Sequence, residues 1–551
     1  MKKRIVLTGI ISLLLVFGVI SCKDPTSTTT YTATYAVGRG SGDAPVKQTV
    51  DEGTAINLPN QRSMTAPSGE TFDGWKDGGG TTYTAGTSYT VTANVLFTAQ
   101  WKNEEIPLDP PKSNLYTGTG TTVTLVSDAG TTLTENLDWL DEYAATPGVY
   151  TIKVSASGSM DEIELKSDRL GDLSSVDITL TTAGTAEMII ALKSNGRLFT
   201  VGDGGAGDNI TLTLGGSITL QGRSNNITQL VHVNRDDTLK LTENAKITGN
   251  NSGGGVEVDG GTITMSGGTI SGNNGGGVRL RGLGATFTMF DGEISGNTAG
   301  EGSGVKVEDS AEFTMTGGTI SGNTSTWGGG GVRVQSNGKF TMSGGEISDN
   351  TASKDSGGGV NVVDNATFTM SGGTISGNTA REGGGVRVEH TGTIFEMSGG
   401  KISGNTAESG GGVRVQNNAT FNMSGTAVIS GNTARDGGGV KVQNTGTTFT
   451  MSGGTISGNT STWDGGGGVR VESATFAKSG GTIYGSDGSA LKNTATNTNY
   501  GQAVQLDPGP GNKKRNLTAG SEIKLYATYV SGSWIFDDGG SIGDTTANWV
   551  E

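Results

Sequence analysis

The chain repeats one short unit through its second half, and this periodicity limits the folds that are open to it. The unit is clearest as Gly-Gly-Gly-Val-Arg-Val, then Phe-Thr-Met-Ser-Gly-Gly, then Thr-Ile-Ser-Gly-Asn-Thr. Its marker isoleucine recurs between Ile247 and Ile483 at spacings of 23, 24, 26, 27, 28, 27, 27, 27 and 27 residues. A period of about 20 to 50 residues is typical of solenoids, propellers and repeat arrays.

The residue types within the unit favour a parallel β-solenoid. Three short strands, each ended by Gly, would form one coil, and successive coils would stack about 4.8 Å apart. A propeller blade needs about 40 residues. The Leu/Asn frame of leucine-rich repeats and the calcium-binding nonapeptide Gly-Gly-x-Gly-x-Asp are both absent from the sequence. We therefore predict an all-β chain with parallel β-helix repeats over residues 218–490.

Columns of identical residues support this prediction. In Val332-Arg333-Val334, alternation with period two directs both Val side chains to the core and Arg333 outward. A Phe column runs from Phe287 to Phe476, a Met column from Met265 to Met451, and an Asn column from Asn250 to Asn459. We expect Phe and Met to fill the core, and the stacked Asn amides to hydrogen-bond from coil to coil.

Composition excludes several classes of function. The 551 residues include 97 Gly, 1 Cys and 2 His, and the formal net charge is −15. A single Cys excludes a disulfide scaffold and a Cys-based zinc site. Two distant His argue against a His-rich metal site and a Ser-His-Asp triad, and the acidic balance argues against nucleic acid as a partner. We expect no cofactor and no metal.

The N-terminus has the features of a secretion signal. Lys2, Lys3 and Arg4 precede an apolar run of 16 residues, which is too short for a comfortable membrane span and ends in Val19-Ile20-Ser21-Cys22. This ending resembles the bacterial lipoprotein lipobox, which implies a signal peptide over 1–21, lipidation at Cys22 and a polar tether over 22–30. An ordinary signal peptide with an incidental Cys, or an uncleaved anchor, is the alternative.

A first small domain is predicted over residues 31–102. Its strand-like runs alternate with Gly and Pro turns, and Phe72, Trp75 and Trp101 can supply a core. The runs Phe72–Trp75, Thr82–Gly86 and Phe97–Trp101 resemble the internalin-type B repeat, also called the Listeria–Bacteroides repeat. The resemblance implies a small β-grasp-like fold that serves as a surface spacer or adhesion module. Residues 103–113 contain three prolines and predict a stiff linker.

The segments that flank the repeats predict caps. Residues 114–217 and 491–551 hold less regular strands, and solenoids need atypical ends to cover exposed strand edges. The repeats themselves resemble the pectate-lyase-like coils of repeat-rich bacterial surface lipoproteins. That resemblance implies a right-handed β-helix.

The outward position of the Val-x-Val strand carries the main candidate site. It is basic in seven coils: Arg279, Lys306, Arg333, Arg387, Arg414, Lys441 and Arg470. Such a column could bind a polyanion such as a sulfated glycan, or it could be balanced by neighbouring acids such as Glu308, Glu389 and Glu472. Trp327 and Trp463 precede Gly runs and could stack on sugar or fill corners. Asp355, Asp364, Asp436 and Asp464 do not cluster on adjacent coils, so we predict no catalytic residue.

These features together predict a non-enzymatic, lipid-anchored cell-surface protein. We expect it to be monomeric, to lie at the outer membrane or cell surface, and to have a structural or adhesive role toward host glycans or matrix proteins. The alternative is a carbohydrate-active β-helix enzyme, a polysaccharide lyase or hydrolase. Enzymes of this shape need irregular coils and long loops to build a cleft, whereas these coils are near copies.

Overall fold

The protein consists of two compact units, Met1–Glu105 and Ile106–Glu551, which are described separately. The computed structural model describes residues 28–103 except 62, 68 and 69, segments between 116 and 205, residues 207–485 except 464, and further segments between 491 and 550. Cys22, and the predicted linker 103–113 beyond its first residue, lie outside the described residues.

The first unit is a small β domain. Its main sheet has the strand order β3-β1-β9-β6-β7. The strands are β1 (Thr30–Ala36), β3 (Gln48–Asp51), β6 (Glu70–Lys76), β7 (Thr82–Tyr83) and β9 (Val95–Asn103). Two further pairs, β2 (Ser41–Gly42) with β5 (Met64–Thr65) and β4 (Thr54–Asn57) with β8 (Ser88–Val91), complete it. β1 and β9 run parallel, and the other pairs run antiparallel.

Aromatic side chains form the core of this domain. Trp75 and Phe97 are fully buried, and Tyr35 lies 5.0 Å from the first ring and 5.8 Å from the second, centroid to centroid. Of the residues predicted from sequence, Trp75 and Trp101 are buried, whereas Phe72 is only half-buried and packs edge-on to both. Such aromatic pairs let a sheet of this size hold a core.

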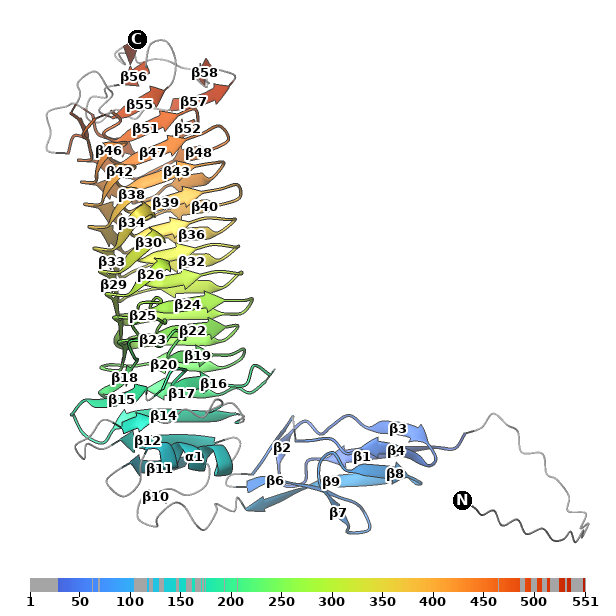
Figure 1. Cartoon of the computed structure of the whole chain (residues 1–551). Coiled ribbons are helices and arrows are strands. Elements are labelled where there is room, and N and C mark those ends of the chain that lie inside the picture. The colour runs from blue at the N-terminus through green and yellow to red at the C-terminus, as the bar shows by residue number, and fades with distance from the viewer. Residues whose placement is uncertain are drawn as a thin grey trace, which may run out of the picture. The chain divides into compact units, whose positions relative to one another are not determined.

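The second unit is a parallel β-solenoid of about 12 turns, whose coils stack as successive layers (Figure 1). One coil consists of β28 (Glu312–Met315), β29 (Thr319–Ser321), β30 (Thr324–Gly328) and β31 (Val332–Val334). β28 and β29 belong to a 28-stranded sheet (sheet 1), β31 to a 14-stranded sheet (sheet 2) and β30 to an 8-stranded sheet (sheet 3). The coil therefore has four strands, not the predicted three, because the segment after Asn323, where no strand was predicted, forms β30 and pairs with the equivalent segments of the neighbouring coils.

Parallel pairing extends beyond the regular repeats. It begins where β11 (Thr122–Ser127) pairs with β12 (Gly148–Val154), well before residue 218. α1 (Leu133–Tyr143) lies between these strands in sequence and buries Leu133, Leu137 and Leu140. At the other end β57 (Leu525–Val530) runs antiparallel to β52 (Thr475–Lys478). Both elements interrupt the coil pattern where an open sheet edge would otherwise be exposed.

Two apolar columns fill the solenoid core, as predicted. The Phe rings from Phe287 to Phe476 stack at centroid distances of 4.6–5.0 Å with interplanar angles of 2–19°. The Met column from Met265 to Met451 is at most 1% exposed. Each coil therefore removes one aromatic ring and one thioether from water. At about 25 cal/mol per Å² of buried apolar surface, this stabilises the fold by several kcal/mol per coil.

The predicted Asn ladder is present and longer than expected. Asn323 donates from Nδ2 to Asn350 Oδ1 at 2.9 Å and to the carbonyl of Ile294 at 2.9 Å. The backbone N–H of Asn323 donates to the same Asn350 oxygen at 2.9 Å. The ladder continues to Asn493, whose oxygen accepts from Asn459 Nδ2 at 2.9 Å. Asn493 escaped the sequence prediction because 34 residues, rather than 27, separate it from Asn459.

The glycine at the bend of sheet 1 is required by the Met column. Gly373 has a φ of +80°, and a Cβ there would lie 2.6 Å from Met342 Cε and 2.9 Å from the carbonyl oxygen of Gly345. An L side chain would therefore collide with the core column and adopt a disfavoured backbone conformation. This contact explains why Ser-Gly-Gly follows Phe-Thr-Met in coil after coil.

The Phe column yields a test of the core. We expect Phe368→Ala to lower the free energy of unfolding by about 3–5 kcal/mol, because it opens a cavity between two stacked rings. Phe290, which is 54% exposed, is the matched control, and Phe290→Ala should change stability little. Urea denaturation followed by circular dichroism measures both variants. Equal midpoints for the two variants would contradict the stacked core.

Candidate functional site

The basic residues predicted from sequence form one column on sheet 2. They lie at the centres of β24 (Val278–Arg281), β27 (Val305–Val307), β31, β39 (Val386–Glu389), β43 (Val413–Gln416), β47 (Val440–Gln443) and β51 (Val469–Glu472). Neighbouring members are paired in register, as Arg279 with Lys306 and Lys306 with Arg333. Asn361 of β35 (Val360–Val362) takes the place between Arg333 and Arg387.

Every cation of this column (the sheet 2 column) contacts a carboxylate. The closest partners are Glu308 for Arg279 (2.6 Å) and Lys306 (3.2 Å), Glu301 for Arg333 (3.4 Å), Glu389 for Arg387 (2.6 Å), Glu382 for Arg414 (3.4 Å), and Asp436 for Lys441 and Arg470 (2.5 Å for the latter). Some of these acids end the strands of sheet 3, and the others lie two residues beyond the cation in sheet 2. The column is thus an ion-pair network, which is the balanced arrangement that the sequence left open.

The centre of the network is buried although it points away from the core. Arg387, Arg414 and Lys441 are 8%, 7% and 5% exposed. The Gly corner that leads into each strand lies against them: a Cβ at Gly383 would be 2.9 Å from the Cβ of Arg387. Burial lowers the pKa of Arg414, and Glu382 opposes this shift. Removing one partner of a buried pair typically costs about 3–5 kcal/mol, so these cations are part of the packing.

A second cluster, which sequence reasoning missed, surrounds Glu257 near the N-terminal coils. His232 Nδ1 lies 3.3 Å and Arg281 Nε 3.3 Å from its carboxylate, with Arg279 at 3.6 Å and Arg197 at 3.9 Å. The close contact with the His232 imidazole lowers the pKa of Glu257 against the opposing effect of burial. The signal was present in the sequence, because Val231-His232-Val233 and Val256-Glu257-Val258 place both residues at the outward position of Val-x-Val.

A buried carboxyl lies at the turn before β20 (Thr238–Leu241). Asp237 is 0% exposed; its Oδ1 accepts the N–H of Ile210 at 2.8 Å, and its Oδ2 has no hydrogen-bond partner among the described residues. Gly202, with a φ of +74°, lies so close that a Cβ there would be 1.8 Å from Oδ2. Burial, together with the nearby carboxylates of Asp208, Asp236 and Asp203, raises the pKa of Asp237 to about 7.

The two tryptophans of the Ser-Thr-Trp segments are exposed. Trp327 is 54% and Trp463 59% exposed, so the corner-filling interpretation is wrong. Lys354 Nζ lies 5.4 Å from the ring centroid of Trp327, and Arg435 Cζ lies 4.1 Å from that of Trp463. Both are cation–π contacts. Trp327 lies at a register irregularity between β30 and β34, whereas Trp463 lies after the end of β50.

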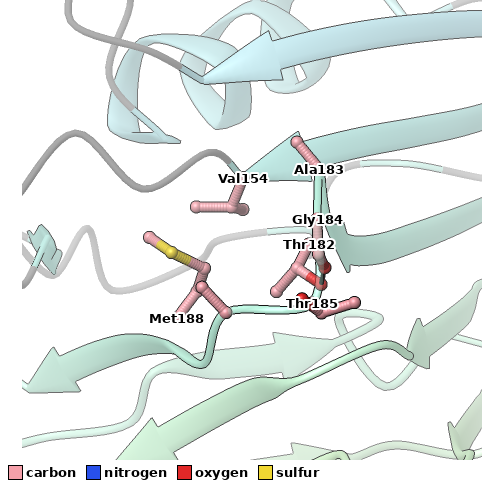
Figure 2. A pocket seen from close by; sticks show the side chains of 7 residues that line it. Val154, Thr182, Ala183, Gly184, Thr185 and Met188 are labelled. Atoms are coloured by element: carbon pink, nitrogen blue, oxygen red, sulfur yellow. Dashed lines mark hydrogen bonds between the residues drawn. The ribbon is translucent and has the colours of Figure 1, made fainter.

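A hollow of about 250 Å³ opens beside the first coils. Figure 2 shows Val154 and Met188 facing the turn of residues 182–186 across it. Its lining carries no ionisable side chain, so it offers no side chain that could act as a general acid or base. Within the described part of the chain, no group of three or more His, Cys, Asp or Glu is placed to hold a metal ion. None of the helices described there is long and apolar enough to cross a membrane.

Comparison with known families agrees with this architecture. Residues 215–375 and 303–479 match the right-handed beta helix region family, so the solenoid is a right-handed parallel β-helix. Residues 31–100 match the Listeria-Bacteroides repeat domain. The chain therefore carries a Listeria–Bacteroides repeat followed by a right-handed β-helix region. Comparisons with curated proteins and with solved structures give no match.

The raised pKa of Asp237 predicts a pH dependence of stability. Between about pH 4 and pH 7 the folded state holds a proton that the unfolded state releases, so stability falls as the pH rises through this window. We expect Asp237→Asn, which mimics the protonated group, to be more stable than the wild type at pH 8. Its stability should also change less between pH 5 and pH 8. Thermal melts across this range measure both effects, and parallel pH profiles of the two proteins would contradict the assignment.

Proposed function

We propose that the protein is a non-enzymatic cell-surface lipoprotein whose β-helix acts as a structural or adhesive rod. The repetition of side chains along the solenoid is the observation that carries this proposal. Phe rings, Asn amides and ion pairs recur at successive coils, and a partly exposed Thr recurs at the start of each strand of sheet 3 from β30 to β50. A surface of this kind suits binding by many equivalent, weak contacts, whereas catalysis requires groups that converge on one reacting atom.

The domain order supports a surface location. A Listeria–Bacteroides repeat precedes the β-helix, and in the family that it resembles this module is a surface spacer. The lipobox-like ending at Cys22 supports a lipid anchor that would hold the spacer and rod at the envelope. A single acyl chain gives only reversible membrane binding, and stable anchoring takes a second chain or a basic patch.

The enzyme alternative has one observation in its favour. His232, Glu257 and three Arg side chains come together on the outer face of sheet 2. However, the Glu257 side chain is only 6% exposed and lies beneath the guanidinium groups, which are 38–41% exposed. A general acid or base must reach substrate, so this arrangement supports an ion-pair cap better than a catalytic centre.

The anchor has a direct test. When the full chain is expressed in a bacterium, we expect it to take up labelled palmitate and to partition into the detergent phase of a Triton X-114 separation. Cys22→Ala should abolish both, because the chain has no other Cys. Ser21→Ala, which leaves the thiol in place and keeps a small residue before it, is the control. Equal labelling of wild type and Cys22→Ala would refute the lipoprotein assignment.

The choice between rod and enzyme has a second test. We expect purified residues 23–551 to bind components of a glycan and matrix-protein array without releasing unsaturated or reducing ends from polygalacturonate or a glycosaminoglycan. If such ends appear and Glu257→Gln abolishes them while Glu312→Gln, at an exposed ion pair, does not, the protein is an enzyme and the rod proposal is wrong. Folding of both variants is checked by circular dichroism.

A further inference from the structure

We propose that the outer face of sheet 3 binds an acidic polysaccharide along the solenoid axis, between Trp327 and Trp463. This inference rests on the proposed adhesive role and names its surface and ligand class. It replaces the sheet 2 column as the binding face, because the cations there are held by carboxylates and largely covered.

Six successive coils place one outward residue each on this face. In the strands of sheet 3 a small residue points to the core and the residues that follow point outward, as Ala380 and Arg381 do in β38 (Thr379–Glu382). The outward residues form what we call the Trp column: Trp327, Lys354, Arg381, Glu408, Arg435 and Trp463. They come from β30, β34 (Thr351–Ser356), β38, β42 (Thr406–Ser409), β46 (Thr433–Asp436) and the residues after β50 (Thr460–Ser461).

The Trp column is open to solvent, in contrast to the sheet 2 column. The side chains of Arg381 and Glu408 are 61% and 68% exposed, and the indoles at the two ends are more than half exposed. Five coil steps of about 4.8 Å place the two indoles about 24 Å apart. A Thr column, partly exposed, runs beside it and starts each of these strands. The face therefore carries a row of hydroxyl groups and has an aromatic ring at each end.

The Trp column itself has more cations than acids, although the protein as a whole is acidic. The Trp column contains three cations, Lys354, Arg381 and Arg435, and one acid, Glu408. Asp355, beside Lys354, is half-buried and accepts a hydrogen bond from Ser356 Oγ at 2.5 Å. The Arg381–Glu408 pair, at 3.5 Å and well exposed, is weakened by solvent. Lys354 and Arg435 rest on indoles and form no ion pair among the described residues. Their charge remains available to an anionic ligand.

An acidic polysaccharide fits this chemistry better than a lipid surface does. Indole faces pack against the C–H groups of sugar rings, hydroxyls and guanidinium groups bond to sugar hydroxyls and carboxylates, and the cations supply charge complementarity. A bilayer would need contiguous apolar area. On the described part of sheet 3, the large exposed apolar side chains are the two indoles alone. The cation–π contacts also hold each indole in place before binding, which lowers the entropic cost of association.

The test measures binding of residues 23–551 to immobilised heparin, polygalacturonate and neutral dextran at 50 and 500 mM salt, by biolayer interferometry. Phosphatidylcholine vesicles with and without phosphatidylglycerol are measured in parallel. The variants are Trp327→Ala with Trp463→Ala, and Lys354→Gln with Arg381→Gln and Arg435→Gln. The matched control combines Phe290→Ala with Lys339→Gln, an exposed aromatic and an exposed, acid-paired lysine of sheet 1. All of these changes are at exposed side chains, so folding is expected to persist, and circular dichroism checks it.

We expect heparin or polygalacturonate to bind. We expect dextran not to bind at 500 mM salt. The Trp variant should weaken binding at least tenfold. The cation variant should weaken it similarly at 50 mM salt and remove most of its salt dependence. The control should bind like the wild type. Unchanged binding in both sheet 3 variants would overturn the face assignment while leaving an adhesive role intact. Capture of vesicles that depends on the two tryptophans, with polysaccharide binding unaffected, would make lipid the occupant and would also overturn the proposal. Absence of binding to both heparin and polygalacturonate would also overturn it.

Discussion

The distance between coils is the constraint on which the rest of this structure depends. Backbone hydrogen bonding between parallel strands fixes the step at about 4.8 Å, and every side chain therefore lies one step from its copy in the next coil. For Phe this distance allows ring stacking, with centroids 4.7 Å apart at the middle of the column. For Asn it allows an unbroken amide ladder. A side chain that is stabilised by contact with an identical side chain, as Phe and Asn are, can therefore occupy the same position in coil after coil.

Charged side chains cannot recur in this way without compensation. Two unit charges one coil step apart repel by about 3–4 kcal/mol at an effective dielectric constant of about 20. In the sheet 2 column this repulsion is offset by acids at the ends of sheet 3 strands and by acids two residues beyond the cations. Glu382, at the end of a sheet 3 strand, pairs with both Arg387 and Arg414. Where the outward residue is the neutral Asn361, the run of cations is interrupted. The ion pairs are therefore a consequence of the stacking.

Periodicity predicted the parts of this fold that repeat and missed the parts that do not. The inward Val, Phe and Met columns follow from alternation and spacing, and the structure confirms them. The early start of parallel pairing was missed, because β11 and β12 use Leu, Ile and Tyr in place of the Gly-Asn and Phe-Met signals. The burial of Arg414 was also missed: period two gives the direction of a side chain, but not the corner backbone that crosses above it.

The same reasoning explains why sheet 3 differs more from coil to coil than sheet 2 does. A change in the sheet 2 column leaves a buried carboxylate without its partner, which is costly. On sheet 3, Glu382 and Asp436 end their strands and pair with cations of sheet 2, but the residues before them, Arg381 and Arg435, are exposed. At the other coils the Trp column has Trp, Lys or Glu. The solenoid can therefore exchange residues at that position with little loss of stability. A binding surface needs side chains that can vary on a rigid backbone, and in this solenoid such variation is confined to the outer face of sheet 3.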